Sequence, residues 1–588
     1  MSYQAPLRDM QFVLEDVVGL ERIAQLPGYE EATPDLAAAV LEEANKLASE
    51  VLAPLNTTGD TNPARWTEDG VLTPPGWKEA YTQFAEGGWI SLSADPNHGG
   101  QGLPMVLSTA VQEMWHASNM SFGLCPLLTQ GAIDALHLHG SEALKTTYLD
   151  KMISGEWTGT MNLTEPQAGS DLAAVRTKAE RKDDHYLISG QKIFITYGDH
   201  DLTDNIVHLV LARTPDAPPG VKGISLFVVP KFLVNDDGSP GERNDARCVS
   251  IEHKLGIHAS PTSVMSFGDN GGAVGYLVGE ENKGLMYMFV MMNLARHTVG
   301  VEGYAIAERA YQQAVGYARD RVQGPTLCAG ESKGIINHPD VRRLLMTMRS
   351  TIEAARALSY EHAGTFDRAG KSADADEAKK LMQRAELLTP LVKGWCTEMG
   401  VELCSLGVQV HGGMGFIEET GAAQYYRDAR ITTIYEGTTA IQANDLIGRK
   451  CARDGGEGIA ELLADMRDVA GQLGDEMAGV RRGLESGIAA AEAATEWLLA
   501  QDDPRLPAAA SVNYLMLMGT VAGGWMMARR AIAAQSKLAA GEGDASFYEA
   551  QLTTARFYMS QLMPRALAWR DAVVEGSADA LALEDVQF

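Results

Sequence analysis

A single carboxylate near the end of a long helical region could carry out proton chemistry. Glu436 lies between Tyr435 and Gly437 in the segment Ile431–Thr439, with threonines on both sides and no lysine or arginine immediately adjacent. A carboxylate in an apolar, dewatered pocket has a raised pKa and is a stronger base. The pattern therefore makes Glu436 a candidate general base, although in an unknown sequence such a glutamate is more often a solvent-facing residue after a turn.

A second candidate lies at Leu163–Asp171, where predicted helices give way to predicted strands. The residues Glu165–Ser170 predict a turn whose free backbone N–H groups and hydroxyls could bind a polar ring or a phosphate. Taken alone, this segment could equally be an ordinary capping turn. The segment becomes a more specific signal of a binding site when it is taken together with the strand-like segment Lys192–Gly198, a short way downstream.

The elements that must position these residues follow from the hydrophobic periodicity. Apolar positions in residues 34–55 recur at helical spacing, and Pro54 is expected to end that helix. Short β-branched and aromatic segments, bounded by Gly, Asp and Pro, predict antiparallel strands in a small barrel or sandwich from about Thr158 to Phe267. Long helical patterns follow. We therefore expect an α+β multidomain fold: a helical N-terminal domain (residues 1–160), a middle β-barrel domain (161–282), a helical bundle carrying Glu436 (283–452) and an additional C-terminal helical domain (453–588).

Composition and charge narrow the class of partner. The chain has 588 residues, of which 45% are hydrophobic and 21% charged, as in ordinary globular proteins. Its formal net charge of -28 argues against nucleic acid or an anionic membrane as a partner, because a polyanion would be repelled. The six cysteines form no C-x-x-C pair, and no metal site or disulfide framework is predicted. Without a secretory signal or an apolar run approaching the ~20 residues that span a bilayer, a cytoplasmic protein is expected.

Four motifs resemble, in order and spacing, those of the flavin-dependent acyl-CoA dehydrogenases. The resemblance covers about residues 35–450, and the family has the same succession of a helical domain, a middle β domain and a helical bundle. The added C-terminal region looks most like the subgroup containing 3-methylmercaptopropionyl-CoA dehydrogenases, although some medium- and long-chain enzymes share that layout. The motifs are Thr164-Glu165-Pro166-x-Ala168-Gly169-Ser170-Asp171, Gly190-Gln191-Lys192-x-x-Ile195-Thr196, Gln409-Val410-His411-Gly412-Gly413-x-Gly415, and Arg427-Asp428-x-x-Ile431 running into Ile434-Tyr435-Glu436-Gly437-Thr438.

The resemblance implies that the cofactor is FAD. Leu163 and Thr164 would then hydrogen-bond the pyrimidine side of the isoalloxazine. Thr196 would lie near its N5 atom, and Phe194 would pack on the ring. The family completes this site across a dimer interface, so a homodimer or a dimer of dimers is expected. The other residues at matching positions are Gly169 and Ser170 beside the pyrophosphate, Thr438, and, from the second subunit, Arg321, Gln409, Gly412 and Gly413.

The resemblance also implies where an acyl-CoA would bind. Asn293 and Arg296, on the first bundle helix, match positions that contact CoA, and Ser170 matches a position beside its chain. Tyr435 can wall the acyl pocket, and Gly437 leaves room for the acyl group. Some relatives carry the base beside the CoA-binding arginine, but no carboxylate occurs in Leu294–His297.

The implied reaction is the dehydrogenation of an acyl-CoA to its trans-2-enoyl-CoA, in which Glu436 removes the α proton and the β hydride goes to flavin N5. Electrons would pass to electron-transfer flavoprotein. The expected substrate is 3-methylmercaptopropionyl-CoA, giving methylthioacryloyl-CoA, with a straight-chain acyl-CoA of β-oxidation as the alternative. An acyl-CoA oxidase and a nucleic-acid-binding flavoprotein relative are further alternatives, and the acidic balance speaks against the second.

Overall fold

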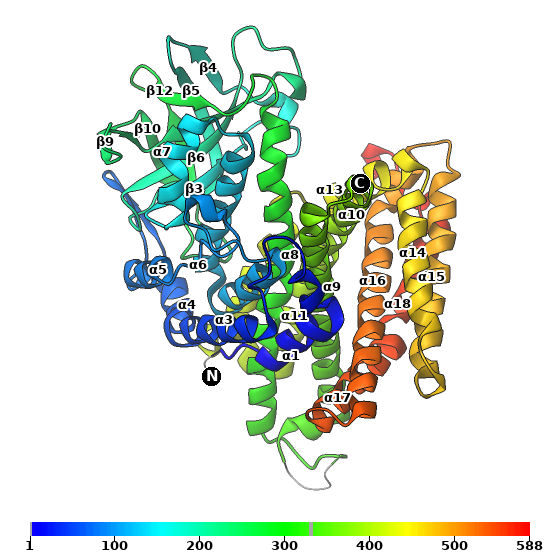
Figure 1. Cartoon of the computed structure of the whole chain (residues 1–588). Coiled ribbons are helices and arrows are strands. Elements are labelled where there is room, and N and C mark those ends of the chain that lie inside the picture. Colours follow the sequence, from blue (N-terminus) through cyan, green and yellow to red (C-terminus); the bar gives the residue numbers. More distant parts are fainter. Residues whose placement is uncertain (1–2, 329–332) are drawn as a thin grey trace.

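The computed structural model describes residues 3–328 and 333–588. In Figure 1 the β domain lies at the upper left above the first helices, the long helices α8 and α9 pass through the centre, and the C-terminal helices stand at the right. The fold is thus a mixed α+β arrangement of helical and sheet domains. The main helices of the N-terminal region are α3 (Pro34–Leu47), α4 (Ala53–Thr61), α5 (Trp77–Glu86), α6 (Met105–His139) and α7 (Glu142–Ile153).

The prediction that Pro54 ends the first long helix was wrong. The helix α3 runs through a π-helical turn, η2 (Ala48–Leu52), directly into α4. Pro54 occupies the first turn of α4, directly after the π turn, so its missing N–H falls where the hydrogen-bond pattern changes between the two elements. The π turn therefore lets one helical segment continue past a residue that would break a regular α-helix.

Eight strands of the middle domain pair in the order β10-β11-β5-β12-β7-β6-β3, and β4 pairs with β5. The expectation of antiparallel strands holds for every pair in this sheet except β3 with β6, which is parallel. The chain leaves β3 and builds β4 and β5 before it returns, and such a long crossover permits parallel pairing. The strands are β3 (Trp157–Asn162), β4 (Lys178–Arg181), β5 (Tyr186–Thr196), β6 (Asn205–Ala212), β7 (Ser225–Pro230), β10 (Ala246–Ile251), β11 (Thr262–Phe267) and β12 (Ala273–Leu277).

The bundle is built on two helices that cross in unusually close contact. Gly303 of α8 faces Gly400 of α11, and a Cβ atom at Gly400 would lie only 2.2 Å from the Gly303 carbonyl oxygen. A larger residue at Gly400 would therefore force α8 and α11 apart. The helices of this region are α8 (Gly284–Asp320), α9 (Pro339–Lys371), α10 (Ala375–Pro390), α11 (Cys396–His411), α12 (Ala422–Ala429) and α13 (Thr439–Arg449).

The helical pattern of the sequence continues from about Asp376 to Leu406, which predicts one helix, but the structure divides this segment. The helix α10 ends at Pro390, and a π-helical turn, η7 (Leu391–Trp395), leads into α11. A proline in a helix removes one backbone hydrogen bond, and a π turn is one way to accommodate the loss. This turn carries Lys393, which faces the loop that contains Glu436.

The C-terminal helices pack on the bundle and continue its core. Trp395 of η7 is buried, and a Cβ atom at Gly519 of α16 would lie 2.3 Å from its ring, so the two elements are in close contact. One hydrophobic cluster extends through the N-terminal helices, the bundle and the C-terminal region, while the sheet has a smaller core of its own. These helices are α14 (Glu457–Gly471), α15 (Ala478–Leu499), α16 (Arg505–Ala540), α17 (Ala545–Phe557) and α18 (Pro564–Val574).

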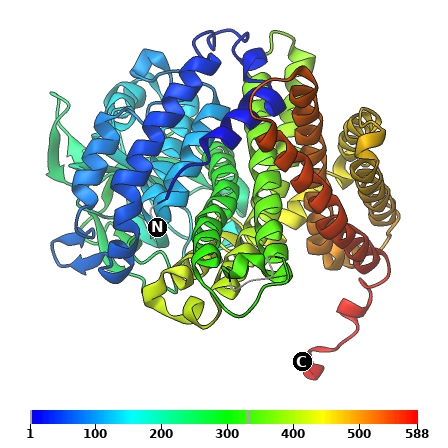
Figure 2. The same ribbon diagram turned by 90° about the horizontal axis from the view of Figure 1, so that it is seen from below.

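The N-terminal helix α1 (Leu7–Phe12) ties the bundle to the C-terminal helices. Asp9 receives hydrogen bonds from Arg356 of α9 and from Arg530 of α16, and all three side chains are buried. In Figure 2 this first segment lies across the bundle towards the C-terminal helices. Residues that are more than 500 positions apart in the sequence are thereby held together.

The helix α16 is long and apolar enough, by length and composition, to cross a membrane, although no such segment was predicted from the sequence. Within the described part of the chain it is the one helix that meets this test, and 67% of its most apolar window is buried inside the protein. Its apolar side chains are therefore largely covered by neighbouring helices.

Candidate active site

Glu436 lies in the loop between α12 and α13, in a backbone conformation that is rare for a residue with a side chain. Its φ is +56°, and Gly437 follows at +92°. The left-handed region costs a non-glycine residue of the order of 1 kcal/mol or more, so the surrounding structure must impose it. Thr438 ends the turn as the N-cap of α13, where its hydroxyl accepts a hydrogen bond from the backbone N–H of Ile441.

Side chains from three helical elements hold this loop. The hydroxyl of Tyr435 donates a hydrogen bond to Glu302 of α8. On the other side of Glu436, the ammonium group of Lys393 donates to the carbonyl oxygen of Gly437 at 2.7 Å. The side-chain amide of α13 residue Gln442 donates to the carbonyl oxygen of Glu436 itself at 3.2 Å. The strained turn is thus fixed on both sides of the candidate base.

The electrostatic surroundings favour a carboxyl group that can exchange a proton near neutral pH. Burial raises the pKa of Glu436 to about 7, while the charges of Arg296 and Lys393 act in the opposite direction. Among the described residues, its carboxylate makes no hydrogen bond or ion pair, so its oxygens are free to accept a proton. This is the arrangement that a general base requires.

The middle domain brings three of the predicted cofactor residues, Thr164, Phe194 and Thr196, together at or beside a bulge in β5. Lys192 pairs with Met265 and Ile195 pairs with Ser263, so β5 carries one extra residue against β11. Within this bulge Phe194 has a φ of +59° and is 59% exposed. A bulge re-aims side chains in this way. The adjacent N–H of Ile193 donates to the carbonyl oxygen of Thr164 at 2.9 Å.

The side chains of Thr164, Ser170 and Thr196 could serve a polar aromatic ring. Their hydroxyl groups make no hydrogen bond to another residue in the parts of the chain that are described, and none of them is buried. An exposed aromatic ring at Phe194 lies on the same strand segment as Thr196. Free hydroxyls beside an exposed ring are a donor set that fits an isoalloxazine, which has both a polar edge and a flat face.

A buried ion pair holds the turn that contains Thr164. Lys192 donates to Glu165 at 2.8 Å and to the carbonyl oxygen of Leu163 at 3.0 Å. Burial opposes ionisation of Glu165, but Lys192 and hydrogen bonds from Thr177 outweigh it and lower the pKa of the carboxyl to about 2. Glu165 and Lys192 are therefore structural residues of the motif. Gly169, beyond them, is open to solvent, and a Cβ atom there would meet nothing within 4 Å.

The flavin side and the base side of the candidate site are joined through a loop that follows β10. The strand β11 pairs Thr262 with Thr196, and the preceding loop reaches α12. There the backbone N–H of Ile257 donates a hydrogen bond to the carboxylate of Asp428 at 2.5 Å. The neighbouring Arg427 forms a bidentate ion pair with Asp60. Arg427 and Asp428 thus connect the N-terminal helices and the sheet domain to α12, the helix that precedes the Glu436 loop.

A cleft of about 1250 Å³ opens beside the two predicted CoA-binding residues. Asn293 and Arg296 of α8 line it together with residues of α10, α14 and α16. Arg296 is only 8% exposed, and its Nε atom has no hydrogen-bond partner among the described residues. A buried guanidinium with a free donor at the edge of a cleft is suited to an anionic or carbonyl ligand.

Four predicted cofactor residues lie elsewhere, at the far end of the bundle. The helix α11 runs from Cys396, beside Lys393, to His411, so Gln409 is about 20 Å along the helix from the Glu436 loop. The end of α8 lies there too, because the rings of Tyr317 and His411 are 4.5 Å apart. This end carries four exposed residues, Arg321, Gln409, Gly412 and Gly413.

Sequence reasoning missed two residues that contact the Glu436 loop. Lys393 lies in a segment whose sequence pattern is that of a regular helix, so nothing in the sequence distinguished it from a surface lysine. Glu302 lies six residues beyond Arg296 in the stretch Thr298–Tyr304. It is a charged residue among small and apolar ones, and this contrast was the one sequence signal that could have indicated a role for it. Glu302 is 0% exposed and hydrogen-bonded to Tyr435, whereas Glu436 is half-buried with a free carboxylate. Glu436 therefore remains the better candidate for the base.

Four family profiles match the chain in succession. They are the acyl-CoA dehydrogenase N-terminal domain (residues 36–156), the middle domain (160–270), the C-terminal domain (282–450) and the acetyl-CoA dehydrogenase C-terminal-like domain (459–584). The chain belongs to the acyl-CoA dehydrogenase family, as the four motifs predicted.

Individual relatives match over nearly the whole length. The 3-methylmercaptopropionyl-CoA dehydrogenase of Ruegeria pomeroyi is 52% identical over 98% of this chain and 98% of its own. A butyryl-CoA dehydrogenase of Syntrophomonas wolfei is 35% identical over 100% and 99%. The crystal structure of an acyl-CoA dehydrogenase complexed with FAD from Bacillus anthracis has a TM-score of 0.74 at 20% identity, covering 98% of this chain and 93% of that one. This protein is an acyl-CoA dehydrogenase with the extra C-terminal domain.

Proposed function

We propose that the protein is an FAD-dependent dehydrogenase that converts 3-methylmercaptopropionyl-CoA to methylthioacryloyl-CoA, with Glu436 as the base. The similarity to the Ruegeria enzyme over both full lengths supports the substrate. The observation that carries the mechanism is the free, half-buried carboxylate of Glu436, held in a strained turn with a pKa of about 7. A straight-chain acyl-CoA is the alternative substrate, and the similarity to a butyryl-CoA dehydrogenase favours it.

The chain's own residues would move one proton. Glu436 takes the hydrogen from the carbon next to the thioester carbonyl, and its raised pKa makes it a stronger base than an exposed glutamate. Arg296 and Lys393 place positive charge near the base, which keeps the ionised form available. Negative charge that develops on the thioester oxygen needs hydrogen-bond donors, and the free backbone N–H groups of the loop are available for that role.

Bound FAD supplies the acceptor for the β hydride, which leaves with its electron pair as the α proton goes to Glu436. Thr164 and Thr196 would hydrogen-bond its ring system, Phe194 would cover the ring, and Leu163 would contribute through its backbone. Gly169 and Ser170 would lie nearer the phosphates, where an open glycine permits close approach.

The remaining cofactor residues lie too far along the bundle to serve the same site, which favours a site completed by a second copy. Arg321, Gln409, Gly412 and Gly413 would then bind the FAD of the other subunit in a homodimer or a dimer of dimers. Mixing Arg321→Ala with Glu436→Gln protein tests this. Each variant alone should be inactive, and a hybrid should regain one complete site with measurable activity. No recovery in a verified hybrid dimer would contradict sharing.

The cleft beside Asn293 and Arg296 would receive the CoA portion of the substrate. The C-terminal helices form one of its walls, so they would shield the CoA entrance and support the bundle. A chain truncated at Gly455 should lose thermal stability and show a raised KM for acyl-CoA. Unchanged oligomer size, stability and kinetics in the truncated chain would refute this role.

A substrate panel tests the choice of thioester. The methylthio substrate and pentanoyl-CoA have chains of equal length, and they differ only in a sulfur atom in place of a methylene group. A higher kcat/KM for the methylthio compound than for pentanoyl-CoA, butanoyl-CoA and octanoyl-CoA supports the proposal. A preference for any straight-chain thioester would establish the alternative.

Electron-transfer flavoprotein is the proposed electron acceptor, and the cytoplasm is the proposed location. The rate of flavin reoxidation by air distinguishes this dehydrogenase from an oxidase. After anaerobic reduction by substrate, the flavin should be reoxidised slowly by air and quickly by a ferrocenium-type acceptor. Rapid turnover with air would assign the protein to the oxidases. A retained, salt-sensitive complex with DNA would instead favour the nucleic-acid-binding relatives, against the net charge of -28.

A further inference from the structure

Glu302 is a fully buried carboxyl group behind the candidate base, and its hydrogen-bonding capacity is only partly used. One oxygen, Oε2, accepts the hydroxyl of Tyr435. The other, Oε1, has no hydrogen-bond partner among the described residues. The nearest candidate is Nδ1 of His116 on α6, 4.0 Å away, which is too far for a direct hydrogen bond and is itself without a partner in the described chain.

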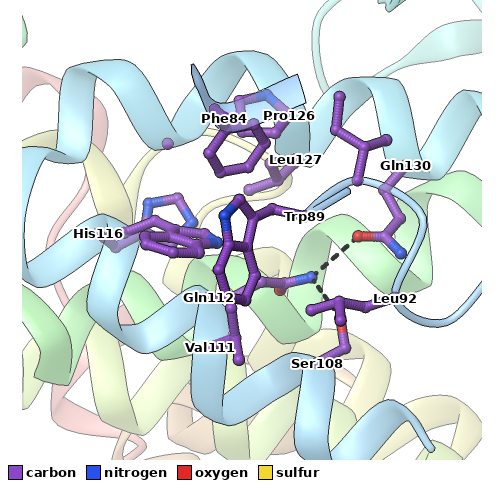
Figure 3. Close-up of a pocket in the computed structure, with 13 residues that line it drawn as sticks. Phe84, Trp89, Leu92, Ser108, Val111, Gln112, His116, Pro126, Leu127 and Gln130 are labelled. Atoms are coloured by element: carbon purple, nitrogen blue, oxygen red, sulfur yellow. Dashed lines mark hydrogen bonds between the residues drawn. The ribbon is translucent and has the colours of Figure 1, made fainter. Parts of the chain in front are cut away.

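The surroundings of Glu302 favour its uncharged form. His116 cannot supply a compensating charge, because burial lowers the pKa of its imidazole to about 3. Its ring lies in a packed region of α6, where it lines a small pocket with Phe84, Trp89 and Gln112 (Figure 3). Burying an isolated ionised carboxylate costs far more free energy than burying a neutral carboxylic acid.

The charges of Glu436 and Lys393, which belong to other elements, also act on Glu302. Burial raises the pKa of Glu302 to about 8; the Tyr435 hydrogen bond acts against this rise, the charge of Glu436 adds to it, and Lys393 of η7 opposes it. The rise therefore prevails, and at neutral pH Glu302 is mainly a neutral acid. A neutral acid still accepts the Tyr435 hydroxyl through its carbonyl oxygen.

The hydrogen bond from Tyr435 acts on the conformation of the next residue. Glu436 needs its φ of +56° to be imposed from both sides. After Glu436, the carbonyl oxygens are held by Gln442 and Lys393. Before Glu436, the side-chain contact that ties the loop to the long helix α8 is the one between Tyr435 and Glu302. Close packing of α8 against α11 at Gly303 in turn fixes where Glu302 stands.

We propose that Glu302 is a positioning residue for the dehydrogenation: its buried carboxyl group accepts the hydroxyl of Tyr435 and so holds the carboxylate of Glu436 at the α carbon of the thioester. This inference rests on the proposed role of Glu436. It assigns to Glu302 no contact with the substrate and no proton transfer. An uncharged acid at this position also leaves Glu436 as the single negative charge that the two carboxyl groups present near neutral pH.

Three variants test this role, with one matched control. Glu302→Gln keeps a neutral carbonyl acceptor for Tyr435, whereas Glu302→Ala and Tyr435→Phe each remove the hydrogen bond. Tyr558→Phe removes a comparable buried hydrogen bond in the C-terminal region, where the hydroxyl donates to the carbonyl oxygen of Thr520 at 2.9 Å. FAD content and thermal midpoint are measured for every variant beside kcat and KM.

We expect Glu302→Gln to retain kcat within about threefold. Glu302→Ala and Tyr435→Phe should lower kcat by about 10–100-fold, because small displacements of a reacting group have effects of this size. KM and FAD content should change little, since the binding contacts remain. The control should behave as the unmodified protein. The exchange of substrate α hydrogens with deuterated water, which reports the proton step alone, should slow by the same factor as kcat.

Equal activity of Glu302→Ala and the unmodified protein would overturn the inference, as would a Gln variant as impaired as the Ala variant. Loss confined to KM or FAD content would also overturn it. If Glu302→Ala does not fold, Tyr435→Phe and Glu302→Gln decide the question by the same criteria. Glu436→Gln is measured in parallel: an active Glu436→Gln enzyme refutes the proposed base, whereas an inactive one beside a normal Glu302→Ala enzyme refutes only the positioning role.

Discussion

The ammonium group of Lys393 lies 2.7 Å from the carbonyl oxygen of Gly437, the residue that follows Glu436. Lys393 belongs to the π-helical turn η7, and single π turns within helices occur frequently at functional sites. Burial lowers the pKa of this lysine to about 8, against the attraction of Glu436 and Glu302. One side chain therefore both holds the loop and supplies positive charge beside the candidate base.

Replacing Lys393 with methionine should impair the enzyme through both of these effects. The unbranched side chain is kept with one atom fewer, but the hydrogen bond to the loop and the positive charge are lost. We expect kcat to fall by about tenfold or more, because the turn that carries Glu436 loosens. Lys46→Met, a change at an exposed position of α3, is the control and should leave kcat unchanged. Steady-state kinetics with full FAD occupancy provide the measurement, and a normal kcat in Lys393→Met would show that the loop does not need this contact.

Glu436→Gln should keep the FAD-bound protein but remove the base. A positioned general base contributes roughly 10²–10⁴-fold to the rate, so substrate should bleach the flavin more slowly by at least this factor. Anaerobic stopped-flow absorbance measures the bleaching directly. Near-normal bleaching in the variant would exclude Glu436 as the base and would turn attention to another carboxyl group.

The pH dependence of kcat/KM should show an acid limb near pH 7. Glu436 must be ionised to accept a proton, and burial raises its pKa to about 7, so activity rises as pH increases through this value. The Lys393→Met variant should move the limb to higher pH, because Lys393 lowers the pKa of Glu436 in the unmodified protein. A limb near pH 4–5, where exposed glutamates titrate, would contradict the buried environment.

Arg530→Met should destabilise the protein far more than Arg8→Met, although both arginines pair with an aspartate. Arg530 is fully buried and hydrogen-bonds Asp9 and Gln551, whereas the Arg8–Asp544 pair is about half exposed. Breaking a buried pair costs about 3–5 kcal/mol, and an exposed pair is worth about 0–1 kcal/mol. Denaturant unfolding of the two variants compares these losses, and similar midpoints would show that Asp9 is satisfied by Arg356 alone.

The sequence allowed a good prediction of the architecture, because periodicity is a local property. Long apolar repeats marked the bundle helices, and short β-branched segments marked β5, β6 and β7. The errors came where a local rule was overridden. Pro54 does not end its helix because a π turn places it in a new first turn, and β3 pairs in parallel because its partner is chosen by the path of the chain.

The sequence by itself determined the family, since four motifs in fixed order are a property of the chain alone, and the family matches confirm it. The same motifs predicted Glu436 as the base, and that role stays a prediction. Only the tertiary structure decided what holds that base in place. Glu302 and Lys393 lie 134 and 43 residues before Glu436, and no pattern in the chain links such distances. The close crossing of α8 and α11 and the π turn at η7 bring them to one loop, where burial and two nearby positive charges set the pKa of Glu436.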